Sequence, residues 1–444
     1  MNFNIYTVFL FITINFTSIG QRELSASQAV FDALENNYQI IIAEKQQEIA
    51  QKNNKWSEAG LFPTVTLSVA NNNTIQDNTD NPFTFTPGII LNQSINPSLS
   101  ANWNLFSGFA VKISKQRLEQ LETQSKNNAT AIIETTIQDV LKGYYSAKLQ
   151  NDRMEMFQSV LTLSRDRYEY YELKEKYSGS SSLELLQFKN QYLTDSTNYL
   201  MQEISYKNAI RNLALLMNDT TNVEQGFVLT DKIDVALTDV NFESAREELF
   251  ANNQNLKNQY INLELQKTNT SFQRSFLYPT LTFTAGVNPG WSKIREIKDN
   301  QVEIDTKSLM YYGNFNLRYT LFNNWKNKRA VEVSKIQEEI ASLNIENMKQ
   351  SLSSTLSNLI AIYKVRIQLV SISQENLLYA QKAFDLAEKR FKLGTINSIE
   401  LAGFQNNYQN TMIQHYENLY NKLDAFLEIY KMTGKIGLEY ANQK

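Results

Sequence analysis

Two pairs of adjacent glutamates are the residues whose types and spacing could support acid–base chemistry. Glu247 and Glu248 form one pair, and Glu338 and Glu339 form the other. Paired carboxylates can act as general acid and general base when their surroundings separate their pKa values. Both pairs lie in segments with helical periodicity, where charges usually form a solvated face, and neither accompanies a motif for a reactive site. The sequence therefore predicts that the chain is not an enzyme.

Residues that bind metals or act as nucleophiles are scarce. The sequence contains no cysteine and a single histidine, His415. The absence of cysteine excludes disulfides, thiolate metal sites, cysteine nucleophiles and a lipid-modified N-terminal cysteine. His415 occupies the place in an apolar helical stripe that Tyr199 occupies earlier in the chain, so we favour a packed position over a catalytic or metal-binding one. No metal and no other cofactor is expected.

The N-terminal segment and the charge bear on compartment and partners. The net charge is −3, from 43 basic and 46 acidic residues, and no basic patch indicates a nucleic-acid partner. Residues 5–16 form an apolar run that precedes the small residues Ser18 and Gly20. This run is typical of a cleaved export signal at 1–20, and it is shorter than the ~20 apolar residues that span a bilayer.

The sequence is duplicated with a constant offset. Residues 61–67 correspond to residues 277–283, and the offset is 279 − 63 = 216 at their shared proline. The same offset relates Glu184 to Glu400. Each half therefore contains a helix, a strand, a loop, a strand, a very long helix, a tight turn and a helix, in that order.

The placement of proline predicts the long helices. The stretches 98–278 and 290–444 contain no proline, which costs about 3 kcal/mol inside a helix. Residues 112–176 would form a helix about 100 Å long, which needs other helices along its length. Tight turns at 177–180 and 391–396 end the long helices. Gly179 and Gly394 there fit the left-handed residue of a helix C-terminus.

Four segments alternate apolar and polar residues, and they are predicted to be strands. Their polar face carries Thr, Ser and Asn, with Arg318 as its only charge. All four tryptophans lie in or beside these segments, and we expect Trp103 and Trp325 to lie at membrane interfaces. These features favour a lipid-facing wall over a soluble sheet packed on a core. The segments 71–93 and 288–307 between paired strands are expected to be loops.

Four strands cannot close a barrel, and an open sheet edge in hydrocarbon leaves backbone groups unpaired. Two copies of the chain would give eight strands, whose interior is filled by side chains. Three copies would give twelve strands and a lumen. The long helices would then form a second tube, coaxial with the first.

Short motifs spread over nearly the whole chain resemble those of the TolC-like outer membrane efflux protein family. They are an opening helix, the start of the first strand in each half, the exit from the second strand in each half, and a helical tip. These motifs stand at 24–30, 60–63, 105–108, 276–279, 321–324 and 389–395. The resemblance implies a mixed α and β fold. A homotrimer would form a twelve-stranded transmembrane β-barrel in the outer membrane and a periplasmic α-barrel of long coiled-coil helices.

The resemblance also implies that the helical tips dock to a periplasmic adaptor (membrane fusion) protein, which links the channel to an inner-membrane pump of RND, ABC or MFS type. The tip residues that carry over are Tyr177, Gly179, Ser180, Phe391, Leu393, Gly394 and Thr395. Glu184 and Glu400 are candidates for the periplasmic aperture; the alternative is an ordinary first-turn acid favoured by the helix dipole. The sequence departs from the family's pattern at Gln187, Ile396 and Gly403.

The predicted organisation follows the duplication. A signal peptide at 1–20 precedes a first repeat at 21–218, a linker at 219–242, a second repeat at 243–434 and a tail at 435–444. The first repeat is expected to contain strands at about 61–75 and 95–107 and helices at about 110–177 and 183–217. The second is expected to contain strands at about 277–288 and 309–323 and helices at about 326–391 and 396–432.

The sequence thus favours an outer membrane channel of a tripartite efflux or type I secretion system, a passive duct that performs no chemistry. Two alternatives stay open, a periplasmic structural coiled-coil protein and a stand-alone outer membrane pore. The coiled-coil protein would be water-soluble after removal of the signal, whereas the duct would need detergent. The cargo is not predicted, because drugs, metal ions, proteins and siderophores pass through similar ducts.

Overall fold

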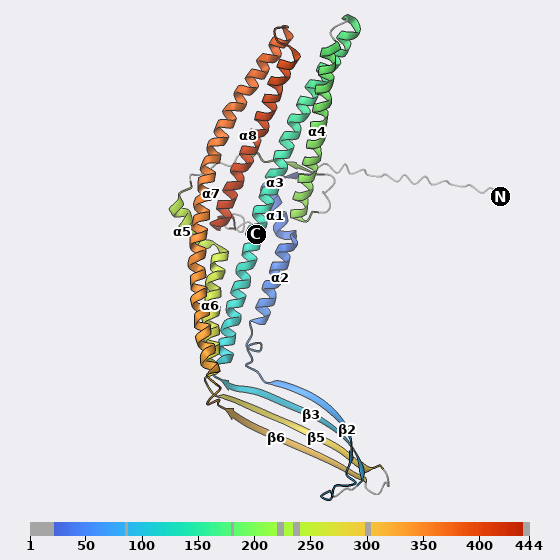
Figure 1. The fold of residues 1–444 in the computed structure, drawn as a ribbon, viewed down its shortest axis with the longest axis vertical. Helices are drawn as coiled ribbons and strands as arrows, with labels where there is room; N and C mark the ends of the chain where they lie inside the picture. Colours follow the sequence, from blue (N-terminus) through green and yellow to red (C-terminus); the bar gives the residue numbers. More distant parts are fainter. Residues whose placement is uncertain are drawn as a thin grey trace, which may run out of the picture. The chain divides into compact units, whose positions relative to one another are not determined.

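A computed structural model describes most of the chain (Figure 1). The described residues are 22–84, 88–178, 182–219, 226–233, 240–297 and 303–437. The predicted signal peptide at 1–20 lies outside these ranges, together with Gly179, Ser180 and parts of the predicted linker and tail.

The chain forms two compact units, which we call the helical unit and the sheet unit. The helical unit comprises residues 1–40, 133–245 and 356–444, and the sheet unit comprises residues 41–132 and 246–355. Each unit takes segments from both halves of the duplicated sequence, so neither unit corresponds to one repeat.

Eight helices lie in the described part of the chain. They are α1 (Ala26–Asn36), α2 (Tyr38–Asn53), α3 (Ala110–Ser178), α4 (Ser182–Met217), α5 (Phe242–Asn252), α6 (Gln254–Ser275), α7 (Lys326–Lys392) and α8 (Ser398–Met432). Helices α3 and α7 contain 69 and 67 residues, so each is about 100 Å long at 1.5 Å per residue. Within the described residues, no helix combines the length and apolarity needed to cross a membrane.

Two helical hairpins dominate the helical unit. Helix α3 returns as α4, and α7 returns as α8 (Figure 1). Lys142 of α3 pairs with Asp424 of α8 at 2.8 Å and also with Glu428 of α8. These ion pairs join the two hairpins. The buried Tyr144 of α3 donates its hydroxyl to the Leu24 carbonyl at 2.9 Å. The Tyr144 bond places the segment around Leu24 against α3.

A short parallel strand pair also belongs to the helical unit. Strand β1 (Arg22–Leu24) pairs with β4 (Phe227–Leu229) in a two-stranded sheet. The sequence analysis did not predict this pair. Three residues are too few for a period-two pattern to be recognised, so sequence periodicity carries no signal for it.

The sheet unit contains four long antiparallel strands. They are β2 (Thr64–Asp77), β3 (Ile89–Ser107), β5 (Thr280–Glu296) and β6 (Glu303–Arg318), in the order β2-β3-β5-β6. The pairing of β3 with β5 joins the hairpin from the first half of the sequence to the hairpin from the second half. Among the described strands, β2 and β6 each have a single partner and form the two edges.

The strands are longer at one end than the alternating pattern predicted. Residues 71–93 and 288–307 were expected to be loops, and this expectation is wrong for most of both segments. The ladder continues to the pair Asp77–Ile89 in the first hairpin and to the pair Arg295–Glu303 in the second. Antiparallel pairing uses backbone groups, so it continues through polar residues. The apolar alternation marks only the part of each strand that faces an apolar environment.

Candidate functional site

The turn between α7 and α8 is closed by backbone hydrogen bonds. Gly394 has φ 73°, the left-handed conformation that was expected of it. The N–H of Gly394 donates to the Phe391 carbonyl at 2.9 Å, and the N–H of Thr395 donates to the Arg390 carbonyl at 3.0 Å. This pair of bonds is the Schellman motif, which satisfies carbonyls left unpaired at the end of α7. The tip therefore has a defined backbone.

Helix α8 begins with a capping box. The Asn397 side chain accepts from the Glu400 N–H at 2.9 Å, and the Glu400 carboxylate accepts from the Asn397 N–H at 3.2 Å. Such reciprocal bonds satisfy two donors at a helix N-terminus. One oxygen of Glu400 is thus already engaged in holding the turn. Glu184 is the third residue of α4, as Glu400 is the third residue of α8. The Glu184 side chain is half-buried.

A hollow of about 990 Å³ lies between the ends of the two hairpins, and we call it the tip hollow. Five of the residues predicted from the sequence line it, namely Glu184, Phe391, Gly394, Thr395 and Glu400. The other lining residues are Leu163, Asp166, Arg167, Tyr170, Tyr171, Lys174, Glu388, Lys392, Ile396 and Asn397. The structure therefore brings both aperture candidates to one hollow within a single chain.

Two predicted tip residues lie apart from the hollow and point to solvent. Tyr177 is 86% exposed and Leu393 is 78% exposed, although both are large apolar side chains. Exposed apolar side chains at the end of a hairpin are typical of a surface that is covered by a partner. Gly179 and Ser180, the other predicted tip residues, lie outside the described residues.

Three aromatic rings pack together beside the tip hollow, and two of them, Tyr171 and Phe391, line it. Tyr171 of α3 lies 4.5 Å from Phe188 of α4, and Phe188 lies 5.8 Å from Phe391 of α7, measured between ring centroids. The ring of Tyr171 also lies 6.2 Å from that of Phe391. The cluster therefore connects the two hairpins. Of its members, Phe391 was predicted from the sequence as a tip residue, but its contact with Phe188 was not.

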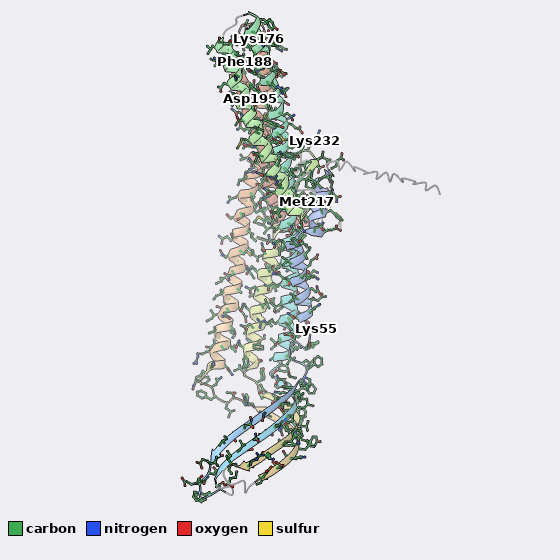
Figure 2. All side chains as sticks on the ribbon, turned by 90° about the vertical axis from the view of Figure 1, so that its right-hand side faces the viewer. Lys55, Lys176, Phe188, Asp195, Met217 and Lys232 are labelled. Carbon is green, nitrogen blue, oxygen red and sulfur yellow. The ribbon has the colours of Figure 1, made fainter. Side chains whose placement is uncertain are left out.

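A buried polar network lies further along the hairpins, and Figure 2 labels Phe188 and Asp195 on α4. Asp195 is almost fully buried. Its carboxylate accepts from the Gln191 side chain at 3.0 Å and from the Gln405 side chain at 3.3 Å. Gln405 in turn accepts from Arg167 at 2.6 Å. The network thus joins α3, α4 and α8 through one carboxylate and one guanidinium.

Burial sets the ionisation of this network. It raises the pKa of the Asp195 carboxyl, although hydrogen bonds from Gln191 and Ser164 act in the opposite direction. Burial lowers the pKa of the Arg167 guanidinium, which the neighbouring Glu388 partly offsets. The sequence analysis missed this network. The available signal was Asp195 itself, a charged residue that stands in α4 between the aromatic residues Tyr192 and Tyr199.

The same stacked aromatic pair occurs in both hairpins. Tyr168 stacks on Tyr192 with ring centroids 5.8 Å apart and an interplanar angle of 4°. Phe384 stacks on Tyr408 at 5.7 Å and 6°. Each member of the first pair precedes its counterpart by 216 residues (384 − 168 = 216; 408 − 192 = 216). The sequence duplication therefore extends to the packing of the hairpins.

His415 lies half-buried between α7 and α8. Its Nδ1 is 3.0 Å from the Ser373 hydroxyl, and burial lowers the pKa of the imidazole. Among the described residues, no group of three or more His, Asp or Glu side chains is placed to hold a metal ion. The glutamate pairs lie on α5 and α7, where Glu247 and Glu339 are exposed to solvent.

One face of the four-stranded sheet is apolar and exposed. Val65, Leu67 and Val69 of β2 and Tyr311 and Phe315 of β6 are all between 64% and 74% exposed. The other face carries the Thr, Ser and Asn residues, with Arg318 at one end and Glu296 of the lengthened β5 at the other. A sheet packed on a soluble core would bury its apolar face, so this face is suited to lipid.

Tryptophans lie at both ends of the apolar face. Trp103 is the register partner of Phe283 and donates its indole N–H to the Leu61 carbonyl at 2.8 Å. Trp325 follows β6 and lies beside Lys328, whose ammonium is 5.4 Å from the ring centroid. Trp291 lies at the opposite end and was not singled out from the sequence. From Leu281 to Trp291 the strand extends about 34 Å, or about 26 Å along the normal at a tilt of ~40°.

The sequence matches a known protein family in both halves. Residues 29–219 and 245–435 match the sequence profile described as Outer membrane efflux protein. The two matches begin 216 residues apart (245 − 29 = 216), the offset of the internal duplication. No curated protein sequence matches the chain significantly.

Solved structures share the fold at low sequence identity. CusC is 15% identical, with a TM-score of 0.73 over 93% of each chain. The CmeC outer membrane channel of Campylobacter jejuni is 13% identical, with a TM-score of 0.74 over 98% of this chain and 94% of that one. The MtrE outer membrane channel of Neisseria gonorrhoeae, solved in its open state, is 16% identical, with a TM-score of 0.67 over 92% of this chain and 88% of that one.

Proposed function

The chain belongs to the outer membrane efflux protein family, and from this premise we propose that it is a passive homotrimeric export duct. As an outer membrane efflux channel it has a helical tunnel in the periplasm. Beyond family membership, we propose that three copies assemble, that their sheets close into one barrel, that the hairpin ends dock a partner and that the duct carries out no chemical step. The observation that carries it is a four-stranded sheet with one exposed apolar face and two unpaired edges.

The unpaired edges support assembly from copies of the chain. In hydrocarbon, each unpaired backbone group costs several kcal/mol, because no water is present to bond it. The edge strands β2 and β6 contain 14 and 16 residues, so an inserted monomer would carry many such groups. Pairing β6 of one chain with β2 of the next removes both edges. Three chains would give a twelve-stranded barrel with a water-filled lumen.

The polar face of the sheet supports a passive duct. It presents mainly hydroxyl and amide side chains, which are compatible with a water-filled lumen. The duct itself is assigned no catalytic residue and no cofactor. Energy for export would come from an inner-membrane pump of RND, ABC or MFS type, reached through a periplasmic adaptor.

We assign adaptor docking to the ends of the hairpins. Tyr177 and Leu393 offer exposed apolar contacts, and Gly394 and Thr395 present a turn with a defined backbone. Phe391 supports the turn from below, while Gly179 and Ser180 complete the other hairpin end in sequence. A preformed turn lowers the conformational entropy lost on binding, which favours recognition by a partner.

We assign the periplasmic aperture to Glu184 and Glu400. Both line the tip hollow, so each chain would contribute two carboxylates to a ring at the tunnel's end. A ring of carboxylates favours cations over anions. Because the capping box already engages Glu400, replacing it would also loosen the start of α8. Replacement of Glu184 is therefore the cleaner test of selectivity.

In-cell photo-crosslinking tests the docking assignment. A photoreactive residue at Thr395 is expected to capture a periplasmic adaptor, which mass spectrometry would identify. Thr355 on α7 is a matched control, since it is the same residue type, is exposed, and lies 40 residues from Thr395 along the chain (395 − 355 = 40). Capture of an adaptor from both positions would contradict docking confined to the tips, and capture from neither position would contradict docking and favour a stand-alone pore.

A further inference from the structure

The apolar face of the sheet ends abruptly at Trp291. Successive residues that share this face stand opposite one another in register across the four strands. From Leu281 to Pro289 on β5, and from Leu309 to Leu317 on β6, this face carries no charge. The next row contains Trp291 and Lys307 as register partners, and the row beyond it contains Lys293 and Asp305.

A hollow of about 410 Å³ lies on this face at the boundary, and we call it the boundary hollow. Its lining combines an aromatic ring, amide side chains, two ammonium groups and one carboxylate, that of Asp305. The residues that matter here are Trp291, Lys293, Lys307, Asn71, Asn73 and Gln93. All six belong to the sheet unit and stand at odd-numbered positions, on the face that carries Val65 and Leu67.

The charges of the hollow favour an anion at Lys307. Lys293 pairs with Glu303 and lies 4.0 Å from Asp305, so its charge is largely compensated. Lys307 forms no ion pair with any described residue. In the three rows from Trp291 outward, three cations stand against two carboxylates; they are Lys293, Arg295 and Lys307 against Glu303 and Asp305. A phosphate near Lys307 would therefore pair with an ammonium group that forms no ion pair with a described carboxylate.

The neutral side chains favour a sugar beside that phosphate. The Gln93 amide donates to Asn73 at 3.3 Å, and the Asn73 amide donates to Asn71 at 3.3 Å, which leaves a row of amides along the floor. Amides of this kind bond hydroxyl groups, and Trp291, 45% exposed, offers a flat apolar surface beside them. A binding site with one aromatic anchor and a few convergent polar groups is typical of small-ligand recognition.

We propose that the boundary hollow binds the phosphorylated sugar headgroup of a glycolipid in the outer leaflet of the membrane. The acyl chains would lie along the apolar face, the sugar would rest on Trp291 and the amides, and the phosphate would contact Lys307. The position fits, because the boundary hollow lies toward the hairpin ends of the strands, and the opposite ends of β3 and β6 are the ones that lead into α3 and α7. The inference rests on the proposed insertion of the sheet.

Native mass spectrometry of the full-length protein in detergent tests this proposal. The probes are diphosphoryl lipid A, its dephosphorylated counterpart and phosphatidylglycerol, each titrated separately. The wild-type protein is expected to bind diphosphoryl lipid A most tightly. Lys307→Gln should weaken that binding by about tenfold, the loss of one charge-assisted hydrogen bond, while Lys307→Arg should retain it.

Lys328→Gln is the matched control, since Lys328 also lies beside a tryptophan but at the opposite end of the apolar face. It should leave the binding of lipid A unchanged. Equal binding of phosphorylated and dephosphorylated lipid A, equal binding of phosphatidylglycerol, or an equal loss in Lys328→Gln would overturn the headgroup assignment alone. A protein that stays monomeric and water-soluble, and binds none of the lipids, would instead overturn the inserted trimer together with this inference.

Discussion

The two helical hairpins come from equivalent parts of a duplicated sequence, yet they share packing and differ in charge. Both contain the stacked aromatic pair. The buried network takes Arg167 and Asp195 from the first hairpin, and 216 residues later the sequence has Ala383 and Thr411. Both copies keep the packing geometry, whereas the buried Arg167 and Asp195 occur in the first hairpin and the second hairpin contributes Gln405 and Glu388 to the same network. The hairpins are therefore not interchangeable parts of the helical unit.

The largest expected effect comes from two phenylalanines at equivalent positions. Phe188 is 6% exposed within the aromatic cluster, whereas Phe404 is 42% exposed on α8. Phe188→Ala should lower the unfolding free energy by about 3–5 kcal/mol, because it removes buried contacts and leaves a cavity. Guanidinium unfolding of the helical signal would measure this loss. Phe404→Ala should cost about 1 kcal/mol, and an equal loss at both positions would contradict the asymmetry.

The second effect separates the buried arginine from a solvated neighbour. The Arg167 side chain is 13% exposed, and Arg165, two residues away, is 63% exposed and pairs with Glu169. Arg167→Ala should cost about 2 kcal/mol, since it leaves the Gln405 carbonyl oxygen without its charged donor and leaves Glu388 with Lys392 as its cationic partner. Arg165→Ala should cost less than about 0.5 kcal/mol, as exposed ion pairs do. The same unfolding measurement applies, and similar losses would mean that the network contributes little.

A third effect depends on pH. Burial raises the folded-state pKa of Asp195 above its unfolded value of about 4. The resulting stability is fully present below the unfolded pKa and is lost as the pH rises through the folded pKa. Asp195→Asn removes this titration, so the variant should gain stability relative to wild type as the pH rises above about 4. Parallel stability profiles for the two proteins would show that the carboxyl is not desolvated.

The smallest effect compares two glycines of the second hairpin. Gly394 has φ 73° in the turn, and a Cβ there would meet no neighbour, so strain alone decides the outcome. Gly394→Ala should cost about 1 kcal/mol. Gly403 lies inside α8 and also has open space, so Gly403→Ala should stabilise by about 0.5–1 kcal/mol. Thermal unfolding of both variants gives the comparison, and shifts of the same sign would contradict the turn geometry.

The sequence predicted the elements correctly where the conformational preference of one residue type is strong, as it is for proline in helices and glycine in left-handed turns. The absence of proline indicated α3 and α7, and Gly394 indicated the turn. It failed at the far ends of the strands, because Asn71 and Asn73 pair through their backbones and show no apolar alternation. The polar network was missed for a different reason. A pattern along one helix cannot show that Arg167, Asp195 and Gln405 meet from three helices.

The central claim is that copies of the chain pair β6 with β2 to close a barrel, and cysteine crosslinking tests it most directly. The natural chain has no cysteine, so a disulfide reports only the introduced residues. The variants combine Ser68→Cys on β2 with a cysteine at each of 308, 310, 312 and 314 on β6. Ser98→Cys, on the inner strand β3 opposite Ser68, replaces Ser68→Cys in the control.

A disulfide needs Cα atoms about 4.4–6.8 Å apart, so only strands adjacent between chains can form one. In a trimeric barrel, at least one register yields a covalent species about three times the 51.2 kDa chain and nothing larger, while the Ser98→Cys controls stay monomeric. Monomers at every register, closed dimers, or an unlimited ladder of larger species would contradict the trimeric barrel.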